Sequence, residues 1–307
     1  MRKRIYFHIK YYIINNGRCQ RFDPKKGNKP KKSIAKNLPP VDIFWEKGYN
    51  NRMEKYKHDR QFTVRYSEVD FKDEMKISSV LSCLQEIACS SADELGFGYN
   101  FLQPQGIAFL LSGTYLQFNR PIRLGEKITA RTWPTPPSYA VFGREYQIFD
   151  EKGEPLVNAT SRWCAVQLNA GKILQSKFLF GQDYSGYNTD KALEISSPKI
   201  PQFDVEKEGE LRYTMTVAHA DYDHYFHVNN ARYADYCANA FTLEEWSNWR
   251  LKSFFITYAK QCRAGDKLSF YRKPLERGEY LVQGVNGDGQ TVVCTRFAFE
   301  TTATTAP

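Results

Sequence analysis

Residues 221–230 read Asp-Tyr-Asp-His-Tyr-Phe-His-Val-Asn-Asn, and nowhere else do two of the chain's five histidines stand beside carboxylates. A core-facing helix is predicted directly after this stretch, because apolar residues recur there at steps of three and four. An Asn helix cap explains two of the ten residues. The remainder, above all Asp223 and His227, need a chemical reason. The apolar positions of the predicted helix are Ala231, Tyr233, Ala234, Cys237, Ala238, Phe241 and Leu243.

The same order of elements is predicted twice: one strand, one long helix, then four strands. In the first half the strands are 61–66, 108–119, 126–133, 139–150 and 154–169, and the helix has an apolar face made of Ile77, Val80, Leu81, Leu84, Ile87, Ala88 and Leu95. In the second half the strands are 210–220, 251–262, 266–274, 279–285 and 291–300, and the helix is 229–246. We therefore expect domains at 53–180 and 210–301, joined by a linker at 181–209 and followed by a disordered tail at 302–307.

Residue alignment supports an internal repeat. Residues 116–131 align with 256–271 at an offset of 256 − 116 = 140, whereas Asp70 aligns with Asp223 at 223 − 70 = 153. The difference, 153 − 140 = 13, predicts an insertion after the first helix, around residues 97–107. One copy would leave sheet edges open, and two copies in one chain can pair those edges. The prediction is an α+β fold in which one antiparallel sheet serves both halves as a pseudo-dimer.

Charge and composition exclude several classes of protein. Of the 43 Lys and Arg and 34 Asp and Glu, residues 1–52 hold 14 and 3, so they carry +11 and the remainder carries (43 − 14) − (34 − 3) = −2. The basic character thus belongs to residues 1–52, which argues against nucleic-acid binding. Their Lys-rich, Pro- and Gly-containing sequence predicts a disordered tail, and we expect Met53 to be the natural start.

The cysteines and the lengths of the apolar runs indicate where in the cell the protein is expected. Seven scattered cysteines without a C-x-x-C pair argue against a zinc site or a disulfide framework and favour a reducing cytoplasm. No apolar run approaches the ~20 residues of a membrane span, so no integral membrane segment is expected. Nothing groups the histidines with further metal ligands, and neither a metal nor a cofactor is expected.

The loop and the helix start suit thioester hydrolysis. A helix N-terminus presents unpaired N–H groups that can stabilise an oxyanion, and Asp223 or His227 can take a proton from water. A thioester carbonyl is already electrophilic and its thiolate leaves well, so no activated serine is needed. The G-x-S-x-G elbow, the Walker A motif and the dinucleotide-binding glycines are all absent from the sequence.

These residues resemble a known family. The pattern Asp-x-Asp-x-x-x-His-Val-Asn-Asn-x-x-Tyr at 221–233 is similar to the signature of hot-dog thioesterases, in which a sheet wraps around a central helix. Residues 60–300, with Val-Arg-Tyr-Ser-Glu-Val-Asp at 64–70, Glu-Leu-Gly at 94–96 and Arg-Trp at 162–163, resemble acyl-acyl carrier protein (acyl-ACP) thioesterases of plants and bacteria, which have two tandem hot dogs.

The resemblance implies roles for individual residues. Asp223 and His227 match the family's catalytic Asp and His, and Cys262 matches its Cys. Tyr225 stands where the family has Asn, and Gln261 stands where it has Glu and cannot act as a base. We expect Asp223 to activate water or attack directly, His227 to share in proton transfer, and Tyr225 and Gln261 to position water.

Other roles concern the oxyanion, the pocket and the thiol. The backbone N–H groups near Asn229 and Asn230 are expected to polarise the carbonyl. The substrate pocket is expected to involve Leu81, Leu84, Ile87 and Tyr233, although an apolar helix stripe is equally the normal signature of a core. Cys262 is interpreted as a wall residue, with a nucleophilic role left open.

The implied activity is hydrolysis of fatty acyl-ACP, which releases a fatty acid and ends chain elongation. Two alternatives stay open: an acyl-CoA thioesterase, and a non-catalytic protein that binds acyl groups or the carrier. The expected partner is an acidic acyl carrier protein, for which a basic surface is needed, and the chain itself is expected to be a monomer or homodimer. The candidates for that surface are Arg120, Arg123, Arg131, Arg144 and Lys172.

Overall fold

The computed structural model describes residues 12–15, 18–21, 56–194, 200–223 and 227–301. The N-terminal half starts with strand β3 (His58–Thr63), a 3₁₀ turn (Tyr66–Glu68) and helix α2 (Ile77–Glu94). Helix α3 (Tyr99–Leu102) and the turn Gln103–Gln105 lead to the strands. These are β4 (Ile107–Phe118), β5 (Lys127–Pro134), β6 (Phe142–Phe149), β7 (Pro155–Gln167) and β8 (Lys172–Leu174), followed by helix α4 (Ser176–Phe180).

The C-terminal half repeats this order. Helix α5 (Val205–Glu208) leads into strand β9 (Glu210–Thr216), a 3₁₀ turn (His219–Asp221) and helix α6 (Asn230–Ala238). Helix α7 (Leu243–Asn248) then precedes β10 (Trp249–Tyr258), β11 (Lys267–Pro274), β12 (Glu279–Asn286) and β13 (Thr291–Thr301).

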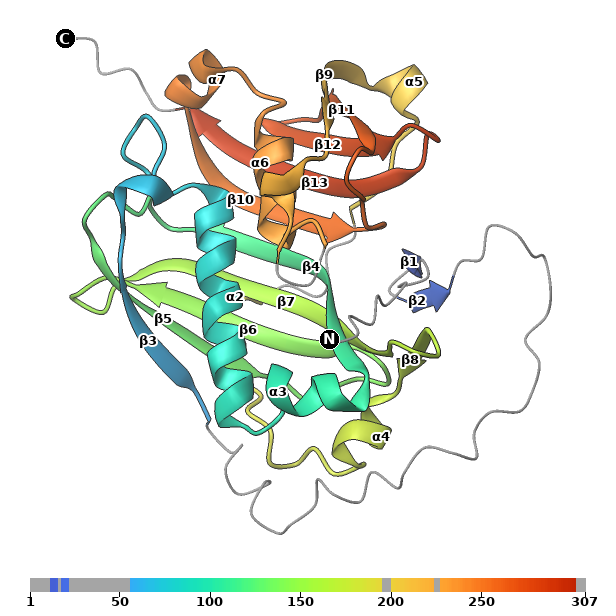
Figure 1. Cartoon of the computed structure of the whole chain (residues 1–307). Coiled ribbons are helices and arrows are strands. Elements are labelled where there is room, and N and C mark those ends of the chain that lie inside the picture. Colours follow the sequence, from blue (N-terminus) through green and yellow to red (C-terminus); the bar gives the residue numbers. More distant parts are fainter. Residues whose placement is uncertain (1–11, 16–17, 22–55, 195–199, 224–226, 302–307) are drawn as a thin grey trace, which may run out of the picture.

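The two halves share one sheet. Its order is β3-β5-β6-β7-β4-β10-β13-β12-β11-β9, with β8 beside β7. The halves join where β4 pairs antiparallel with β10 at Tyr115 and Phe255, whose rings lie 5.9 Å apart. Helices α2 and α6 lie on the same side of the sheet (Figure 1). This confirms the predicted pair of tandem hot dogs and the pairing of their edges.

The apolar helix faces form the core, as their periodicity predicts. On α2, Val80 and Ile87 are fully buried and Leu81 and Leu84 nearly so. On α6, Ala234 and Cys237 are fully buried in the same cluster. A single hydrophobic core therefore runs under both helices and fixes the loop before α6 against the N-terminal half.

The second helix is shorter than predicted. In place of one helix over 229–246, α6 ends at Ala238 and α7 begins at Leu243. The break coincides with a capping box in which Thr242 Oγ1 accepts the Glu245 N–H and Glu245 accepts the Thr242 N–H. The break adds no residues to α2: at the offset of 153, residues 77–94 correspond to 230–247, which hold α6 and α7. The insertion predicted around 97–107 coincides with α3 and the turn Gln103–Gln105 between α2 and β4, whereas α7 ends at Asn248 and β10 begins at Trp249.

Residues 12–21 differ from the prediction of a structureless tail. Strands β1 (Tyr12–Asn15) and β2 (Arg18–Arg21) pair antiparallel, with Asn15 opposite Arg18. The sequence between them, Asn-Gly, is a strong hairpin signal that charge and composition outweighed in the prediction. These two strands are separate from the large sheet, and β2 contacts β8 at one side of the N-terminal half (Figure 1). Residues 22–52 lie outside the described part of the chain.

The segment between the halves is anchored to the sheet. The indole of Trp133 donates to the Asp190 carbonyl over 2.9 Å, and Phe203 N–H donates to the Gln283 side chain over 3.1 Å.

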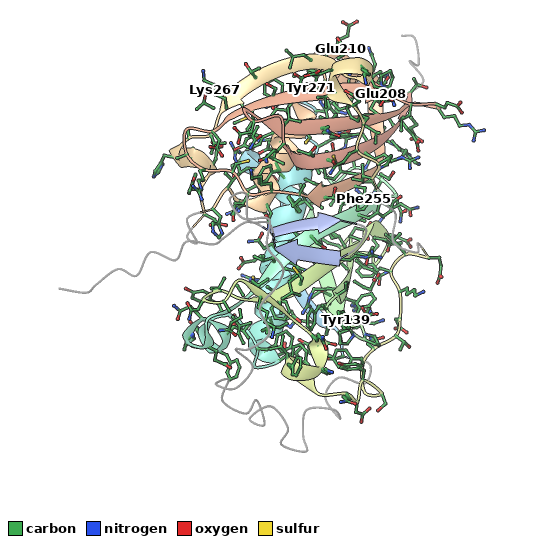
Figure 2. All side chains as sticks on the ribbon, turned by 90° about the vertical axis from the view of Figure 1, so that its right-hand side faces the viewer. Tyr139, Glu208, Glu210, Phe255, Lys267 and Tyr271 are labelled. Carbon is green, nitrogen blue, oxygen red and sulfur yellow. The ribbon has the colours of Figure 1, made fainter. Side chains whose placement is uncertain are left out.

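On the outer face of the sheet, Figure 2 shows Phe255 near the junction and Tyr271 toward the β9 edge. Among the described residues, no helix combines the length and apolarity needed to cross a membrane.

Candidate active site

The loop before α6 is closed at its base by Asp223. The Asp223 N–H donates to the His227 carbonyl over 2.8 Å, and the His227 N–H donates back to Asp223 Oδ1 over 3.3 Å. Tyr222 and Val228 form a β-bridge just outside these bonds. His227 is thereby held one turn before the start of α6, and residues 224–226, which include Tyr225, lie outside the described residues.

Asn229 serves as the helix cap. Its side-chain oxygen accepts the Ala231 N–H over 2.9 Å, and its own N–H donates to the Asp221 carbonyl over 2.9 Å. Asp221 is buried and accepts the Ala218 N–H over 2.7 Å. These two residues of the motif therefore build the loop, while the side chain of Asn230 remains directed to the cavities described next.

Three tyrosine hydroxyls bind the segment after β10 to this loop and helix. Tyr233 Oη accepts the Cys262 N–H over 3.2 Å, and Tyr222 Oη accepts the Ala264 N–H. From the end of β10, the Tyr258 hydroxyl donates to the Asn230 carbonyl over 3.1 Å. Gln261 and Cys262 are thus brought close to the loop before α6, although they lie 30 or more residues after it in the sequence.

A cavity of about 1100 Å³ joins the two halves of the molecule. The loop and its neighbours line one end, through Asp223, His227, Asn230, Gln261 and Cys262. The other end lies in the N-terminal half between α2 and the sheet, lined by Ala88, Ala92, Phe97, Phe109, Phe142 and Phe180 among others. A drug-sized ligand fits a volume of ~300–1,000 Å³, so this cavity has room for a long acyl chain.

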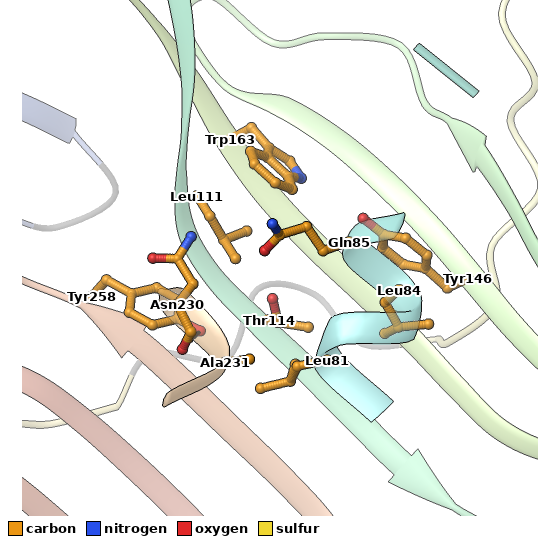
Figure 3. A pocket seen from close by; sticks show the side chains of 10 residues that line it. All are labelled: Leu81, Leu84, Gln85, Leu111, Thr114, Tyr146, Trp163, Asn230, Ala231 and Tyr258. Carbon is orange, nitrogen blue, oxygen red and sulfur yellow. Dashed lines mark hydrogen bonds between the residues drawn. The ribbon is translucent and has the colours of Figure 1, made fainter. Parts of the chain in front are cut away.

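A small cavity of about 20 Å³ lies between the two helices. Figure 3 shows Gln85 of α2 and Asn230 of α6 at this point, with Trp163, Tyr146 and Tyr258 around them. Gln85 and Asn230 also line the large cavity. The start of α6 is therefore the place where the loop before α6 meets the part of the cavity in the N-terminal half.

Comparison with known proteins gives this arrangement a family. The profile of the acyl-ACP thioesterase N-terminal domain matches residues 55–176, and that of the C-terminal domain matches residues 205–298. The chain belongs to the acyl-ACP thioesterase family.

Individual relatives are distant. The acyl-[acyl-carrier-protein] hydrolase FATB3 of Cuphea viscosissima is 23% identical over 212 residues, which cover 66% of this chain and 52% of that protein. The chain thus spans about half the length of the curated relative.

Solved structures with the same fold cover more of the chain. An acyl-ACP thioesterase from Bacteroides thetaiotaomicron superposes with a TM-score of 0.73 at 23% identity, covering 80% of this chain and 98% of the other. The 12:0-ACP thioesterase of Umbellularia californica gives 0.69 at 18% identity, with the same coverage. At these identities the likeness establishes the tandem hot-dog fold.

The site residues predicted from the sequence fall into three groups, which line the large cavity, line the small cavity or lie in the core. Asp223, His227, Asn230, Gln261 and Cys262 line the large cavity, as does Tyr233. Of the predicted pocket residues on α2, Leu81 and Leu84 line the small cavity. Ile87 is fully buried in the core cluster and lines neither cavity.

The wall on α2 is a feature that sequence reasoning missed. The large cavity is lined by Gln85, Cys89 and Ala92, which lie outside the predicted apolar stripe, and by Ala88, the smallest member of that stripe. The signal available in the sequence was the small size of Ala88 and Ala92, which follow the large apolar residues Leu81, Leu84 and Ile87 along the same helix. Small side chains leave a gap between a helix and a sheet, whereas the most apolar positions fill it.

Burial decides which groups in the site hold protons. Burial lowers the pKa of His227, and the nearby Asp223 charge opposes part of that shift. The imidazole is therefore neutral near pH 7 and able to accept a proton. Burial raises the pKa of the Cys262 thiol to about 11, so it is protonated near neutral pH, which fits a wall residue better than a nucleophile.

The basic residues singled out for docking are mostly engaged or buried. Arg120 pairs with Glu126 at 2.8 Å, Arg123 with Glu74 at 3.1 Å and Arg131 with Asp59 at 2.6 Å. Arg144 is only 6% exposed and lines the large cavity, so it is not part of an outer surface. Across the residues that the structure covers, no cluster of His, Cys, Asp and Glu has a metal-binding arrangement.

Proposed function

We propose that this chain hydrolyses the thioester of fatty acyl-ACP, releasing the fatty acid and ending chain elongation. One observation carries the proposal: the cavity of about 1100 Å³ has His227 and Asp223 at one end and an apolar chamber at the other. An acyl chain can occupy the chamber while its thioester lies at the loop. In this proposal residues 53–180 supply the chamber, residues 210–301 supply the catalysis, and 181–209 links them.

The proposed reaction begins with a neutral His227. Its imidazole takes a proton from water, and the resulting hydroxide attacks the thioester carbonyl carbon. In this proposal the backbone N–H of Asn230 and the positive end of the α6 dipole stabilise the oxyanion of the tetrahedral intermediate. The neighbouring N–H groups are already used, since that of Asn229 donates to the Asp221 carbonyl and that of Ala231 to the Asn229 side chain. The C–S bond then breaks, and the imidazolium returns its proton to the carrier's thiolate.

The proposed role of Asp223 is electrostatic and structural. Its carboxylate accepts a hydrogen bond from the backbone N–H of His227. Its negative charge raises the pKa of the His227 imidazole and so favours the protonated imidazole that forms during attack. Direct attack by Asp223 is a second route, in which an acyl-carboxylate anhydride forms and water then hydrolyses it. Labelled water separates the two routes, because only the anhydride route can place an ¹⁸O atom in Asp223.

Gln261 and Tyr225 are proposed to position the attacking water. Gln261 is exposed at the cavity wall beside Cys262, and its amide can donate to or accept from water but cannot remove a proton. Restoring the family's usual carboxylate in Gln261→Glu therefore tests whether a second base accelerates the reaction. A rise in kcat without a change in KM would support this placement.

The decisive experiment is hydrolysis of a panel of acyl-ACPs from short to long chains by the full chain. Release of fatty acid supports the proposed activity, and comparison with the same acyl groups on CoA separates the carrier-protein reading from the acyl-CoA alternative. If the protein binds acyl-ACP without releasing acid from any chain, the non-catalytic alternative holds. His227→Ala is the matched control, because background hydrolysis by a contaminant would survive it.

A further inference from the structure

Two side-chain amides face each other across the small cavity between α2 and α6. Figure 3 shows the Gln85 amide extending from α2 toward the side chain of Asn230 at the start of α6. The two helices contact each other directly, and the cavity between them has a volume of about 20 Å³. That is room for about one water molecule. The residues around it therefore all lie close to one space of the size of an oxygen atom.

The polar rings around this space already have partners within the protein. The indole N–H of Trp163 donates to Ser161 Oγ over 2.8 Å, and Tyr146 Oη lies 3.0 Å from the same oxygen. The Tyr258 hydroxyl donates to the Asn230 carbonyl over 3.1 Å, which fixes the first peptide of α6. These rings thus form a wall that is held in place from behind.

The two amides differ from the other polar side chains of the small cavity. In the described part of the chain, the side chains of Gln85 and Asn230 make no hydrogen bond. Both also line the large cavity, together with His227, whereas the Thr114 hydroxyl lines the small cavity alone. A carbonyl that enters from the large cavity and reaches the start of α6 therefore meets the Gln85 amide on its other side.

The start of α6 has only one backbone donor to offer such a carbonyl. The N–H groups of Asn229 and Ala231 donate within the loop, and that of Asn230 remains. We propose that Gln85 supplies the second donor, with Nε2 binding the thioester oxygen as it becomes an oxyanion. An amide carries both a donor and an acceptor, and an anionic oxygen selects the donor. This inference rests on the proposed thioesterase function and adds a catalytic residue from the N-terminal half.

The related positions of the repeat have no such pair. Asn230 corresponds to Ile77, since 230 − 77 = 153, and Gln85 corresponds to Ala238, since 238 − 85 = 153. Ile77 is the first residue of α2 as Asn230 is of α6. Neither Ile77 nor Ala238 has a polar side chain. The amide pair thus occurs on the side of the two helices where His227 lies and is absent from the related side, as a role in one active site requires.

The test measures hydrolysis, by the full chain, of the acyl-ACP that the wild-type protein cleaves fastest. Gln85→Met keeps the length of the side chain but has no N–H donor, and it should lower kcat about 100-fold, the scale of one lost oxyanion donor. KM should change little, because the interaction is strongest in the transition state. Gln85→Glu should lower kcat further, since its carboxylate has the shape of the amide but repels an oxyanion.

Glu86→Met is the matched control, because Glu86 is the next residue of α2, is exposed and pairs with Arg60 at 3.0 Å. It should keep the wild-type kcat. A near-normal kcat of Gln85→Met, or a higher kcat of Gln85→Glu than of Gln85→Met, would overturn the inference and leave the thioesterase proposal standing. If Gln85→Met does not fold, the isosteric Gln85→Glu decides, and a near-normal kcat of that variant counts against the inference.

Two substrate analogues on the carrier protein separate an oxyanion donor from a packing residue. In a difluoroketone, CF₂ replaces the thioester sulfur, and the hydrate places an oxyanion-like oxygen at the reacting carbon. In a thioether, a methylene replaces the carbonyl. Gln85→Met should weaken binding of the difluoroketone by about the factor by which it lowers kcat and leave thioether binding unchanged. Equal weakening of both analogues would show a general change of the pocket and overturn the inference.

The same analogues apply if the wild-type protein hydrolyses no acyl-ACP, in which case the thioesterase proposal fails by itself. Selective loss of difluoroketone binding in Gln85→Met then still supports the donor role of Gln85. Unchanged binding of both analogues, or no binding of either by the wild-type protein, overturns it.

Discussion

The loop before α2 and the loop before α6 share one pair of hydrogen bonds around an Asp and differ in the residue that faces it. Asp70 N–H donates to the Glu74 carbonyl over 2.8 Å and Asp70 Oδ1 accepts the Glu74 N–H over 3.1 Å. Asp223 makes the same two bonds with His227. A carboxylate at this position therefore builds the turn in both halves, whether or not the half is catalytic.

The residue facing Asp makes the difference. Glu74 forms ion pairs with Lys72 and Arg123, each at 3.1 Å. Both carboxylate oxygens of Glu74 are therefore engaged in ion pairs. His227 takes the same place in the second loop and lines the large cavity. The two loops thus differ in the residue opposite the Asp and in the open space beside it.

The interiors of the two halves differ in the same way. Pro134 pairs with Arg144 where Pro274 pairs with Tyr280, and Leu111 pairs with Trp163 where Leu251 pairs with Phe299. Phe241 lies at the position of Ala88, since 241 − 88 = 153. In the C-terminal half an aromatic cluster, defined as Phe241, Trp246, Trp249, Tyr280, Phe297 and Phe299, fills the space that the N-terminal half leaves as a chamber.

The largest expected effect comes from opening the filled half. Phe241 lies 4.9 Å from Phe297 and 5.2 Å from Phe299, ring centre to ring centre. Phe241→Ala should lower the free energy of unfolding by about 3–5 kcal/mol, because it leaves a cavity inside the aromatic cluster. Denaturant unfolding measures this loss. A loss below about 1 kcal/mol would mean that the cluster is loosely packed and that the contrast with the chamber is wrong.

Removing the catalytic base is the next largest effect. His227→Ala should lower kcat/KM about 100-fold, the scale of a lost acid–base group, and Asp223→Ala should have an effect of similar size. The matched variants Glu74→Ala and Asp70→Ala change the same positions of the other loop and should retain activity. Near-normal turnover of both His227→Ala and Asp223→Ala would refute the assignment, and equal losses in both loops would point to folding instead of catalysis.

Filling the open half should change the substrate range with little change in stability. Ala88→Phe copies Phe241 into the chamber, where the large cavity offers room for the ring. Activity on long acyl chains should fall about tenfold relative to short chains, since the ring occupies the space of several methylenes. Competition between long and short acyl-ACPs in one reaction measures the ratio. An unchanged ratio would show that the acyl chain does not pass Ala88.

The smallest expected effect is on the pH profile. Because burial lowers the pKa of His227 below the ordinary 6.5, the imidazole stays neutral below pH 6.5 and the acid limb of kcat/KM should lie under that value. Asp223→Asn removes the charge that favours protonation, so the limb should move to still lower pH, whereas Asp70→Asn should leave it in place. A limb at or above pH 6.5 in the wild-type protein would contradict the buried, neutral base.

The folded His227 also affects stability in a defined direction. Its pKa is lower in the folded state than in the unfolded chain, so the unfolded chain binds more protons as the solution is acidified. The contribution of His227 to stability is therefore full above about pH 6.5 and is lost as the pH falls through that value toward the lowered pKa. His227→Gln should flatten this part of the stability curve.

Much of the fold was readable from the sequence because its signals are local and repeated. The apolar stripe of α2 and the glycines of the matching turns Gly125 and Gly265, which both adopt positive φ, require no tertiary information. The hairpin β1–β2 and the capping box at Thr242 were equally local signals, but the prediction weighted charge and periodicity above them. The predicted boundaries of the domains and linker stay predictions.

The sequence by itself determined the duplication, the hot-dog fold and the loop that carries Asp223 and His227, because these depend on spacing and side-chain type. Only the tertiary structure decided which half is hollow and which residues line the hollow. Ala88 and Phe241 both belong to predicted apolar helix faces, and the spacing of such faces does not measure the space around each residue. That space is set by which side chains from distant strands reach it: Phe297 and Phe299 pack on Phe241, whereas Ala88 lines the large cavity.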